Sequence, residues 1–163
     1  GIISEKGVGE LKKLALYFDT SVLNFMLFDT SDKGAVTRSF FELLKLGKYD
    51  CYISEIVNRE ILRAPEHKRD LLLELINKFD FQHLELTEET KELAGRYISQ
   101  GIIPEKYRDD ALHISIAVVN KIDVIVSWNF EHIVKLKTKL EVNGISKFYG
   151  YGEIQICTPE EVK

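Results

Sequence analysis

Acidic residues occur at three places among apolar residues, where an ionised carboxylate is unfavourable unless it has a structural or functional role. Asp19 directly follows the run Leu14-Ala-Leu-Tyr-Phe18, whose apolar residues predict a buried parallel strand. Glu60 follows Val57 and Ile56 at helical spacing, on the buried stripe of a predicted helix. Burying an ionised carboxylate is costly unless it is paired or bound to a cation. Glu60 therefore requires a basic partner, a metal ion or a raised pKa.

The third position is the pair Asp109-Asp110, which opens a helix expected over residues 108–121. The rest of that helix is apolar almost all round, which predicts that most of its circumference is buried. Both acids share a stripe with apolar residues further along, so periodicity does not decide which one faces inward. His113 follows one turn later, and we expect it to be a satisfied histidine in or near the core instead of a ligand.

Structural roles compete with a functional role for these acids. Asp19 sits where a helix begins and can cap it, a role for which Thr20 and Ser21 are rivals. In an open α/β sheet, however, ligands bind outside the carboxyl ends of the strands, so an acid at this place is also a candidate site residue. The acids can instead form an ion-pair network with nearby arginines, namely Arg59, Arg63 and Arg108.

Short strands separated by helices are expected to position these residues. Strands are predicted over residues 14–18, 49–54, 81–86, 123–127 and 153–157. The intervening segments predict helices, with loops at 29–34 and 141–152 and a last helical turn from 158. This alternation predicts an α/β fold with parallel βα units, arranged as a single three-layer α/β/α domain. The domain is expected to span residues 1–163, with its core at about 14–157.

Composition narrows the class of protein. The 163 residues are 45% hydrophobic and 29% charged, as in ordinary globular domains. The 22 basic and 26 acidic side chains give a net charge of −4, which lacks the basic footprint of a general nucleic-acid binder. A phosphate substrate therefore needs a metal or a local patch, for which Lys106 and Arg108 beside Asp110 are candidates. The basic run 135–139 fits a solvated helix face as well as a phosphate contact.

No apolar run approaches the roughly 20 residues that span a bilayer, and Gly1–Lys6 lacks the start of a signal peptide. We therefore expect a cytoplasmic protein with no membrane partner. Cys51 and Cys157 lie far apart in strand-like runs and are expected to be buried free thiols. Neither GxGxxG nor GxxxxGK[ST] occurs, which argues against dinucleotide and P-loop sites.

Taken in order, the acidic segments resemble the PIN-domain family of metal-dependent ribonucleases, which includes the toxins of VapBC-type toxin–antitoxin pairs. The resemblance extends over about residues 14 to 157. Each segment alone is weakly specific, and the order of all four carries the resemblance. The matching segments are Tyr17-Phe-Asp-Thr-Ser-Val-Leu23, Ile53-Ser-Glu-Ile-Val-Asn-Arg-Glu-Ile61, Arg108-Asp-Asp-Ala-Leu-His-Ile-Ser-Ile-Ala117 and Ile125-Val-Ser-Trp-Asn-Phe130.

The resemblance implies a sheet of strand order 3-2-1-4-5 with the acids at its carboxyl edge. It selects Asp110 over Asp109 and implies that Asp19, Glu60 and Asp110 are catalytic metal ligands. The family usually has a fourth acid where this chain has Asn129. Asn129 can still offer a carbonyl oxygen or hold a metal-bound water, but one negative charge is missing. Two residues are weaker candidates for contact with substrate or metal-bound water, namely Thr20 and Ser127.

The activity that the resemblance implies is hydrolysis of RNA by an endoribonuclease dependent on Mg²⁺ or Mn²⁺. Carboxylate and carbonyl oxygens are the ligands that these ions prefer, and a divalent cation removes the repulsion among clustered acids. The resemblance further implies an antitoxin protein as partner and a homodimer. The alternative is a catalytically weak or inactive PIN-fold module that binds RNA or protein, because Asn129 replaces the fourth acid.

Overall fold

The computed structural model describes residues 12–162. Five strands form one parallel sheet in the order β3-β2-β1-β4-β5, which confirms the predicted strand order and fold class. The strands are three to six residues long, and the two central ones, β1 and β4, are apolar throughout because helices cover both faces of the sheet. The strands are β1 (Leu14–Phe18), β2 (Tyr49–Ser54), β3 (Gln82–Leu84), β4 (Val124–Val126) and β5 (Gln155–Cys157).

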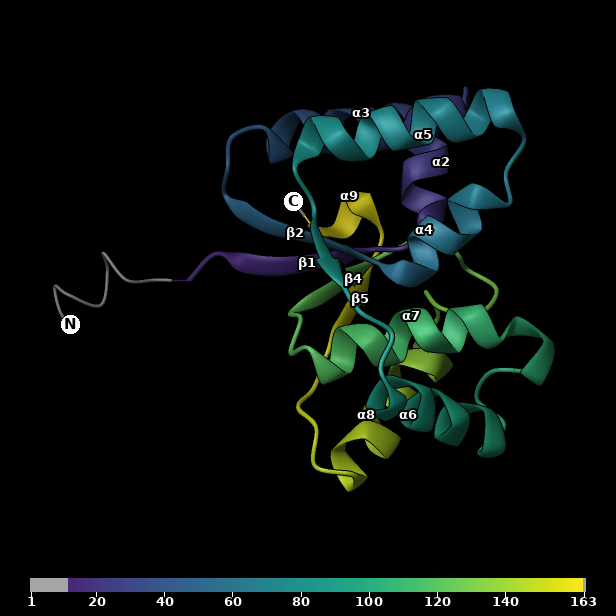
Figure 1. The fold of residues 1–163 in the computed structure, drawn as a ribbon. Coiled ribbons are helices and arrows are strands. Elements are labelled where there is room, and N and C mark those ends of the chain that lie inside the picture. Colours follow the sequence, from purple (N-terminus) through teal and green to yellow (C-terminus); the bar gives the residue numbers. More distant parts are fainter. Residues whose placement is uncertain (1–11, 163) are drawn as a thin grey trace, which may run out of the picture.

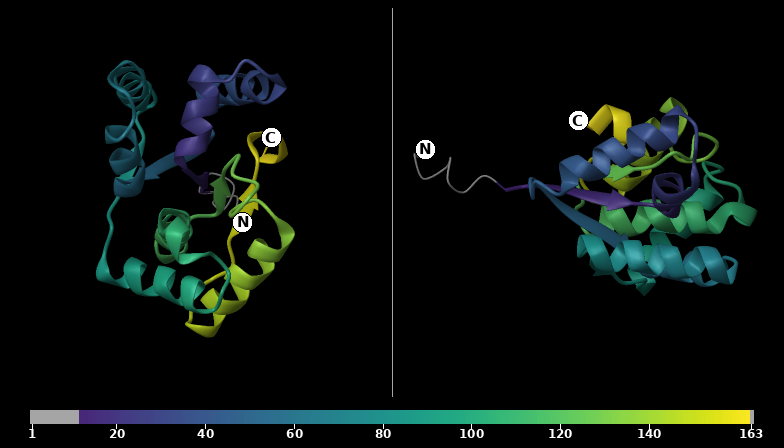
Figure 2. Two further views of the ribbon diagram at one scale, coloured as in Figure 1. Left: turned by 90° about the vertical axis from the view of Figure 1, so that its right-hand side faces the viewer. Right: turned by 90° about the horizontal axis from the view of Figure 1, so that it is seen from above.

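Helices cover both faces of the sheet (Figures 1 and 2). One face carries α2 (Thr20–Phe28), α3 (Asp32–Leu44) and α5 (Glu66–Phe79), with the short α9 (Pro159–Val162) packed against α3. The other face carries α6 (Glu88–Ser99), α7 (Arg108–Val119) and α8 (Leu136–Phe148), and a 3₁₀ turn at Glu105–Tyr107 leads into α7. Helix α4 (Glu55–Leu62) contributes to the cores on both faces.

The central strand β1 shows why the sheet has two cores. Its alternate side chains point to opposite faces, so Tyr17 packs with the α6–α7–α8 core while Leu16 and Phe18 pack with the α2–α3–α5 core. In the neighbouring strand, Ile125 and Val126 divide in the same way. Phe18 and Asp19 are both buried at the end of β1, so the Asp19 carboxylate lies within the protein and not on its surface.

The loop predicted over residues 141–152 is wrong, because α8 runs from Leu136 to Phe148. Its core-facing residues include Val142 and Ser146, and the buried Ser146 hydroxyl lies 2.6 Å from the Tyr97 hydroxyl. A serine that is satisfied by a distant tyrosine looks like a loop residue in the sequence. Gly144 is exposed and lowers helix stability by only about 1 kcal/mol relative to alanine.

Smaller differences concern the ends of elements. Helix α3 begins at Asp32, inside the predicted loop 29–34, because the Ser31 side chain caps it. The last three strands are shorter than predicted, at 82–84, 124–126 and 155–157. The other predicted strands and helices are present, and β2 and α2 have the predicted bounds.

Two sequence predictions concern chemistry and targeting. Cys51 and Cys157 are free, as predicted, but half-buried instead of buried, and burial raises the pKa of the Cys51 thiol to about 12. In the described part of the chain, no helix is long and apolar enough to cross a membrane. The prediction for Gly1–Lys6 lies outside the described residues.

Candidate active site

A cavity of about 310 Å³ opens at the carboxyl edge of the central strands. All four predicted principal site residues line it, although they come from four separate segments of the chain. This is the edge of an open α/β sheet at which ligands bind. The lining residues are Asp19, Thr20, Ser21, Asn24, Glu60, Asp110, His113 and Asn129.

Asp19 has the capping role that the sequence left open, and it also lines the cavity. It is the N-cap of α2, and its side chain accepts a hydrogen bond from the Val22 N–H. Its two carboxylate oxygens accept hydrogen bonds from the hydroxyls of Ser21 and Ser127, each at 2.6 Å. Burial raises the pKa of Asp19 above its ordinary value, and the nearby charge of Glu60 also raises it, although these hydrogen bonds and His113 oppose the shift.

Glu60 is held through one of its two oxygens. Its Oε1 accepts a hydrogen bond from Thr20 Oγ1 at 2.5 Å and lies 2.8 Å from His113 Nε2. Its Oε2 accepts none from any residue that the structure describes. Burial raises the pKa of Glu60, but the hydrogen bond and charge of His113 and the bond from Thr20 outweigh it, so the net shift is downward. Glu60 is therefore held ionised, with one oxygen available to a ligand.

A buried chain of hydrogen bonds supports Glu60 from behind. His113 Nδ1 lies 2.6 Å from the Tyr17 hydroxyl, which lies 2.7 Å from the Ser54 hydroxyl. An ionised carboxylate only accepts hydrogen bonds, so His113 Nε2 donates to Glu60. Burial lowers the pKa of His113, but its hydrogen bond to Glu60 and the charges of the three acids outweigh this, so the net shift is upward. With the ring protonated, Nδ1 donates to the Tyr17 hydroxyl, and with the ring neutral, Tyr17 donates to Nδ1. The prediction that His113 is a satisfied core histidine is confirmed, and its ring also lines the cavity.

The structure separates the two neighbouring acids at the start of α7. Asp110 lines the cavity, whereas Asp109 forms salt bridges of 2.8 Å with Arg59 and 3.2 Å with Arg63. Burial raises the pKa of Asp110, although the charge of His113 and a bond from the Asn129 side chain lower it. The ion-pair alternative therefore describes Asp109, and not the acids of the cavity.

Asn129 uses its side chain within the protein. Its Oδ1 accepts a hydrogen bond from the His132 backbone N–H at 3.0 Å. Its own backbone N–H donates to Ser127 Oγ at 2.9 Å. Asn129 is thus connected to Asp19 through the Ser127 hydroxyl. Ser127 lies behind Asp19 and is not among the residues that line the cavity.

Sequence reasoning missed Asn24, which lines the cavity from α2. It lies four residues after Thr20, so helical spacing from the predicted site was the signal that would have identified it. The predicted steering residues Lys106 and Arg108 do not line the cavity, and Arg108 pairs with Glu105 at 2.8 Å.

The chemistry of the donors fits a hard divalent cation. Three carboxylates and two side-chain amides face one cavity, and oxygen ligands of this kind suit Mg²⁺ and Mn²⁺. Among residues 12–162, however, no three His, Cys, Asp or Glu side chains are already arranged as a metal-ligand group. Both oxygens of Asp19 are occupied by hydroxyls, and Glu60 Oε1 is held by Thr20 and His113. A carboxylate oxygen that accepts one hydrogen bond keeps a second lone pair, so the donor set fits the ion once the acids move closer together.

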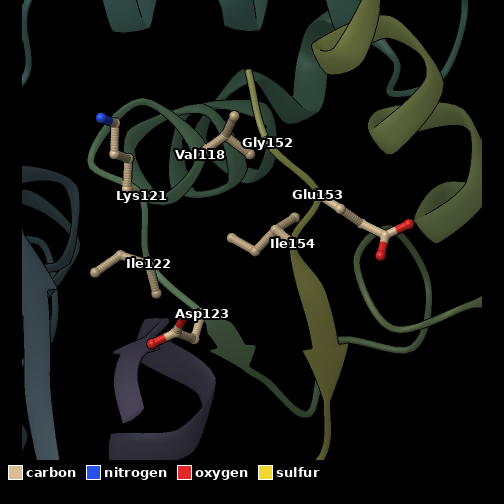
Figure 3. Close-up of a pocket in the computed structure, with 7 residues that line it drawn as sticks. All are labelled: Val118, Lys121, Ile122, Asp123, Gly152, Glu153 and Ile154. Atoms are coloured by element: carbon tan, nitrogen blue, oxygen red, sulfur yellow. The ribbon is translucent and has the colours of Figure 1, made fainter. Parts of the chain in front are cut away.

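A second cavity, of about 290 Å³, lies at the opposite edge of the sheet (Figure 3). Three charged residues line it, namely Lys121, Asp123 and Glu153. Asp123 Oδ2 accepts a hydrogen bond from the Ala15 backbone N–H at 2.8 Å. Its carboxylate therefore ties β1 to the start of β4, and no cluster of acids forms there.

Comparison with known proteins supports the fold. No family model matches the chain, and neither does any curated protein. A chain of the crystal structure of VapBC2 from Rickettsia felis, bound to a DNA fragment from its promoter, matches with a TM-score of 0.56 at 14% identity. The match covers 89% of this chain and 98% of that one.

A toxin–antitoxin complex from Klebsiella pneumoniae matches with a TM-score of 0.54 at 14% identity, covering 76% of this chain and 93% of the other. At this identity the likeness concerns the fold, which is the PIN-like fold that the sequence predicts.

Proposed function

We propose that this chain is an endoribonuclease that uses Mg²⁺ or Mn²⁺ to hydrolyse RNA phosphodiester bonds. The observation that supports this most is the meeting of Asp19, Glu60 and Asp110 in one cavity at the carboxyl edge of the sheet. Two of the three acids have raised pKa values because of burial, and a bound cation would offset the cost of keeping them ionised.

In this proposal the three carboxylates hold the ion, together with amide oxygen from Asn24 or Asn129. When bound, the ion supplies a water of lowered pKa and neutralises charge on the phosphate. The protein's own residues orient the acids: Ser21 and Ser127 fix the Asp19 carboxylate, while Thr20 and His113 fix Glu60 and leave its Oε2 free to bind. Such neighbours of metal ligands typically change metal affinity about 10- to 100-fold.

The test is Mn²⁺ binding by titration calorimetry on the wild type and on Asp19→Asn, because it requires no knowledge of the RNA target. We expect saturable binding that the variant loses, and Asp123→Asn, at the other edge of the sheet, is the matched control. Binding that is equal in all three proteins would contradict the proposed site. A positive result leads to a screen for RNA cleavage with the same variants.

The second candidate function is a PIN-fold module that binds RNA or protein with weak or no catalysis. The arrangement of Asn129 favours it, because its Oδ1 is already used by the His132 N–H and no fourth acid is present. Asn129→Asp distinguishes the two. Activity that appears only in the variant supports the inactive module, whereas cleavage by the wild type excludes it.

We further propose that the chain is a toxin controlled by an antitoxin protein in the cytoplasm. Both structural neighbours described above come from toxin–antitoxin assemblies, which supports the proposal. Induced expression in a bacterial host is expected to arrest growth, and Asp110→Asn is expected to relieve the arrest at equal protein level. Growth arrest by both forms would contradict a nuclease toxin. The predicted homodimer is measured on the same purified protein by sedimentation.

A further inference from the structure

A third cavity lies at the carboxyl ends of β4 and β5. It is next to the cavity that Asp19, Glu60 and Asp110 line, which we call the acid cavity. Its volume is about 480 Å³, and its walls come from the loop after β4, the first turns of α3, helix α8, and α9 with the residue before it. The apolar part of its lining consists of Val36, Trp128, Phe130 and Val134. It therefore occupies the sheet edge at which α/β proteins bind ligands.

One loop separates the two cavities. Along Trp128, Asn129 and Phe130, the first and third residues line the larger cavity and the middle one lines the acid cavity. The Trp128 backbone N–H donates to Ser21 Oγ at 2.9 Å, and the same hydroxyl donates to Asp19. Neighbouring Cα atoms are about 3.8 Å apart, so the two cavities lie on either side of a single stretch of backbone.

The two aromatic residues of this cavity differ in exposure: Trp128 is buried and Phe130 is exposed. Trp128 is 7% exposed, its Nε1 donates to Thr37 Oγ1 at 2.7 Å, and Phe25 stacks on it at 5.6 Å. Phe130 is 45% exposed and meets Trp128 edge to face at 6.0 Å. Lys33 Nζ lies 4.6 Å from the centre of the Phe130 ring. An exposed aromatic ring beside a cation has the features that bind single-stranded nucleic acid.

The charges of the cavity are mixed, which selects among ligands. Two lysines and three acids line it, namely Lys33, Lys139, Asp32, Glu160 and Glu161. This balance does not fit a cluster of phosphates. It fits one base with a single neighbouring phosphate, because carboxylates accept hydrogen bonds from the amino and imino groups on base edges.

We propose that this cavity binds a nucleobase of single-stranded RNA next to the phosphodiester held at the acids, with Phe130 as the stacking surface and Lys33 as the contact to the flanking phosphate. The inference rests on the proposed function for its substrate class. It adds a binding site that is separate from the metal site and is measurable without metal.

The experiment uses Trp128, which is the only tryptophan of the chain, as a reporter inside the cavity. The wild-type chain in EDTA is titrated with a labelled single-stranded RNA octamer of mixed sequence, following Trp128 fluorescence and the anisotropy of the label. We expect a saturable change in both signals. Phe130→Leu keeps apolar volume but removes the ring, so it is expected to raise Kd about 5- to 100-fold, as for the loss of one base–aromatic stack.

Two further variants sharpen the result. Phe130→Tyr retains a ring and is expected to bind within about twofold of the wild type. Phe148→Leu is the matched control, since Phe148 is an exposed phenylalanine on α8, away from this cavity. Equal melting temperatures show that each variant is folded.

Equal RNA affinity in Phe130→Leu, an unchanged Trp128 signal at saturation, or no RNA binding would each overturn the inference. Loss of self-association in Phe130→Leu with unchanged RNA affinity would also overturn it and assign the cavity to contact between copies. Because no metal is present, RNA binding that depends on Phe130 in a chain that never cleaves RNA upholds the inference while the nuclease proposal fails. RNA cleavage by the wild type, with a Kd that Phe130→Leu does not change, upholds the nuclease proposal while the inference fails.

Discussion

The two edges of the sheet hold cavities of nearly equal volume, about 310 and 290 Å³, with an aspartate in each. Asp19 at the carboxyl edge is buried, and its oxygens accept hydrogen bonds from two hydroxyls, with two other acids nearby. Asp123 at the amino edge is exposed and accepts from a backbone N–H (Figure 3). Cavity size therefore does not distinguish a site here. The difference lies in the convergence of one buried and two half-buried acids, whose electrostatic cost makes the carboxyl edge the candidate site.

Removing an acid from each edge gives the largest expected difference. Asp110→Asn and Asp19→Asn are expected to lower the rate of RNA cleavage at least about 100-fold, because each removes a negative ligand of the proposed ion. Asp123→Asn is expected to stay within about twofold of the wild type. Cleavage of a labelled RNA in the presence of Mn²⁺ measures all three, and a large loss in Asp123→Asn would contradict the comparison.

The hydrogen-bond chain behind Glu60 gives the next largest effect. His113→Ala leaves Glu60 without its donor at Nε2, so we expect Mn²⁺ affinity to fall about 10- to 100-fold. Tyr17→Phe removes the partner of both His113 and Ser54 and is expected to lower the free energy of unfolding by about 1–3 kcal/mol. Calorimetry and urea unfolding separate the two. Unchanged Mn²⁺ affinity in His113→Ala would show that Glu60 needs no support.

The electrostatic cost of the site predicts a dependence of stability on pH. Burial raises the pKa of Asp19, so the folded protein holds this proton more tightly than the unfolded chain does. Without metal, the contribution of Asp19 to the free energy of unfolding is therefore expected to fall as pH rises from the ordinary value of 3.8 through the raised value. Asp19→Asn removes this loss and still caps α2, so we expect a gain of about 0.5–2 kcal/mol at neutral pH.

Thermal unfolding in EDTA between pH 4 and pH 8 measures this gain. The stability difference between Asp19→Asn and the wild type is expected to grow as pH rises and to disappear toward low pH. A variant that is less stable than the wild type at every pH would mean that the Ser21 and Ser127 hydrogen bonds outweigh the cost of burial.

The smallest expected effect lies at the amino edge. Asp123→Ala removes the acceptor of the Ala15 N–H, and we expect it to lower the free energy of unfolding by about 0.5–1.5 kcal/mol with no change in Mn²⁺ binding. Urea unfolding measures the first quantity and calorimetry the second. The two variants are therefore expected to have opposite effects on stability. Asp123 stabilises the fold, whereas Asp19 lowers its stability at neutral pH.

Much of the candidate site could be predicted from the sequence, because a carboxylate within an apolar run is costly to bury and stands out from its neighbours. Asp19 at the end of β1 and Glu60 on the stripe of α4 both follow from strand and helix periodicity, and the structure brings them to one cavity. The strand order was also predicted, since the order of the acidic segments resembled a known fold. The second half of helix α8, from residue 141, was predicted as a loop, because its buried serine and its glycine are residue types that are common in loops.

The tertiary structure decides between adjacent residues of the same type, which the sequence cannot tell apart. Asp109 and Asp110 are identical in type and adjacent in α7, and they differ because Arg59 and Arg63, about fifty residues away, bind the first and leave the second in the cavity. His113 likewise takes its partners from β1 and α4. The sequence by itself determined which residues need a partner, because burial and charge follow local periodicity. Only the packing of distant elements decided which partner each residue has.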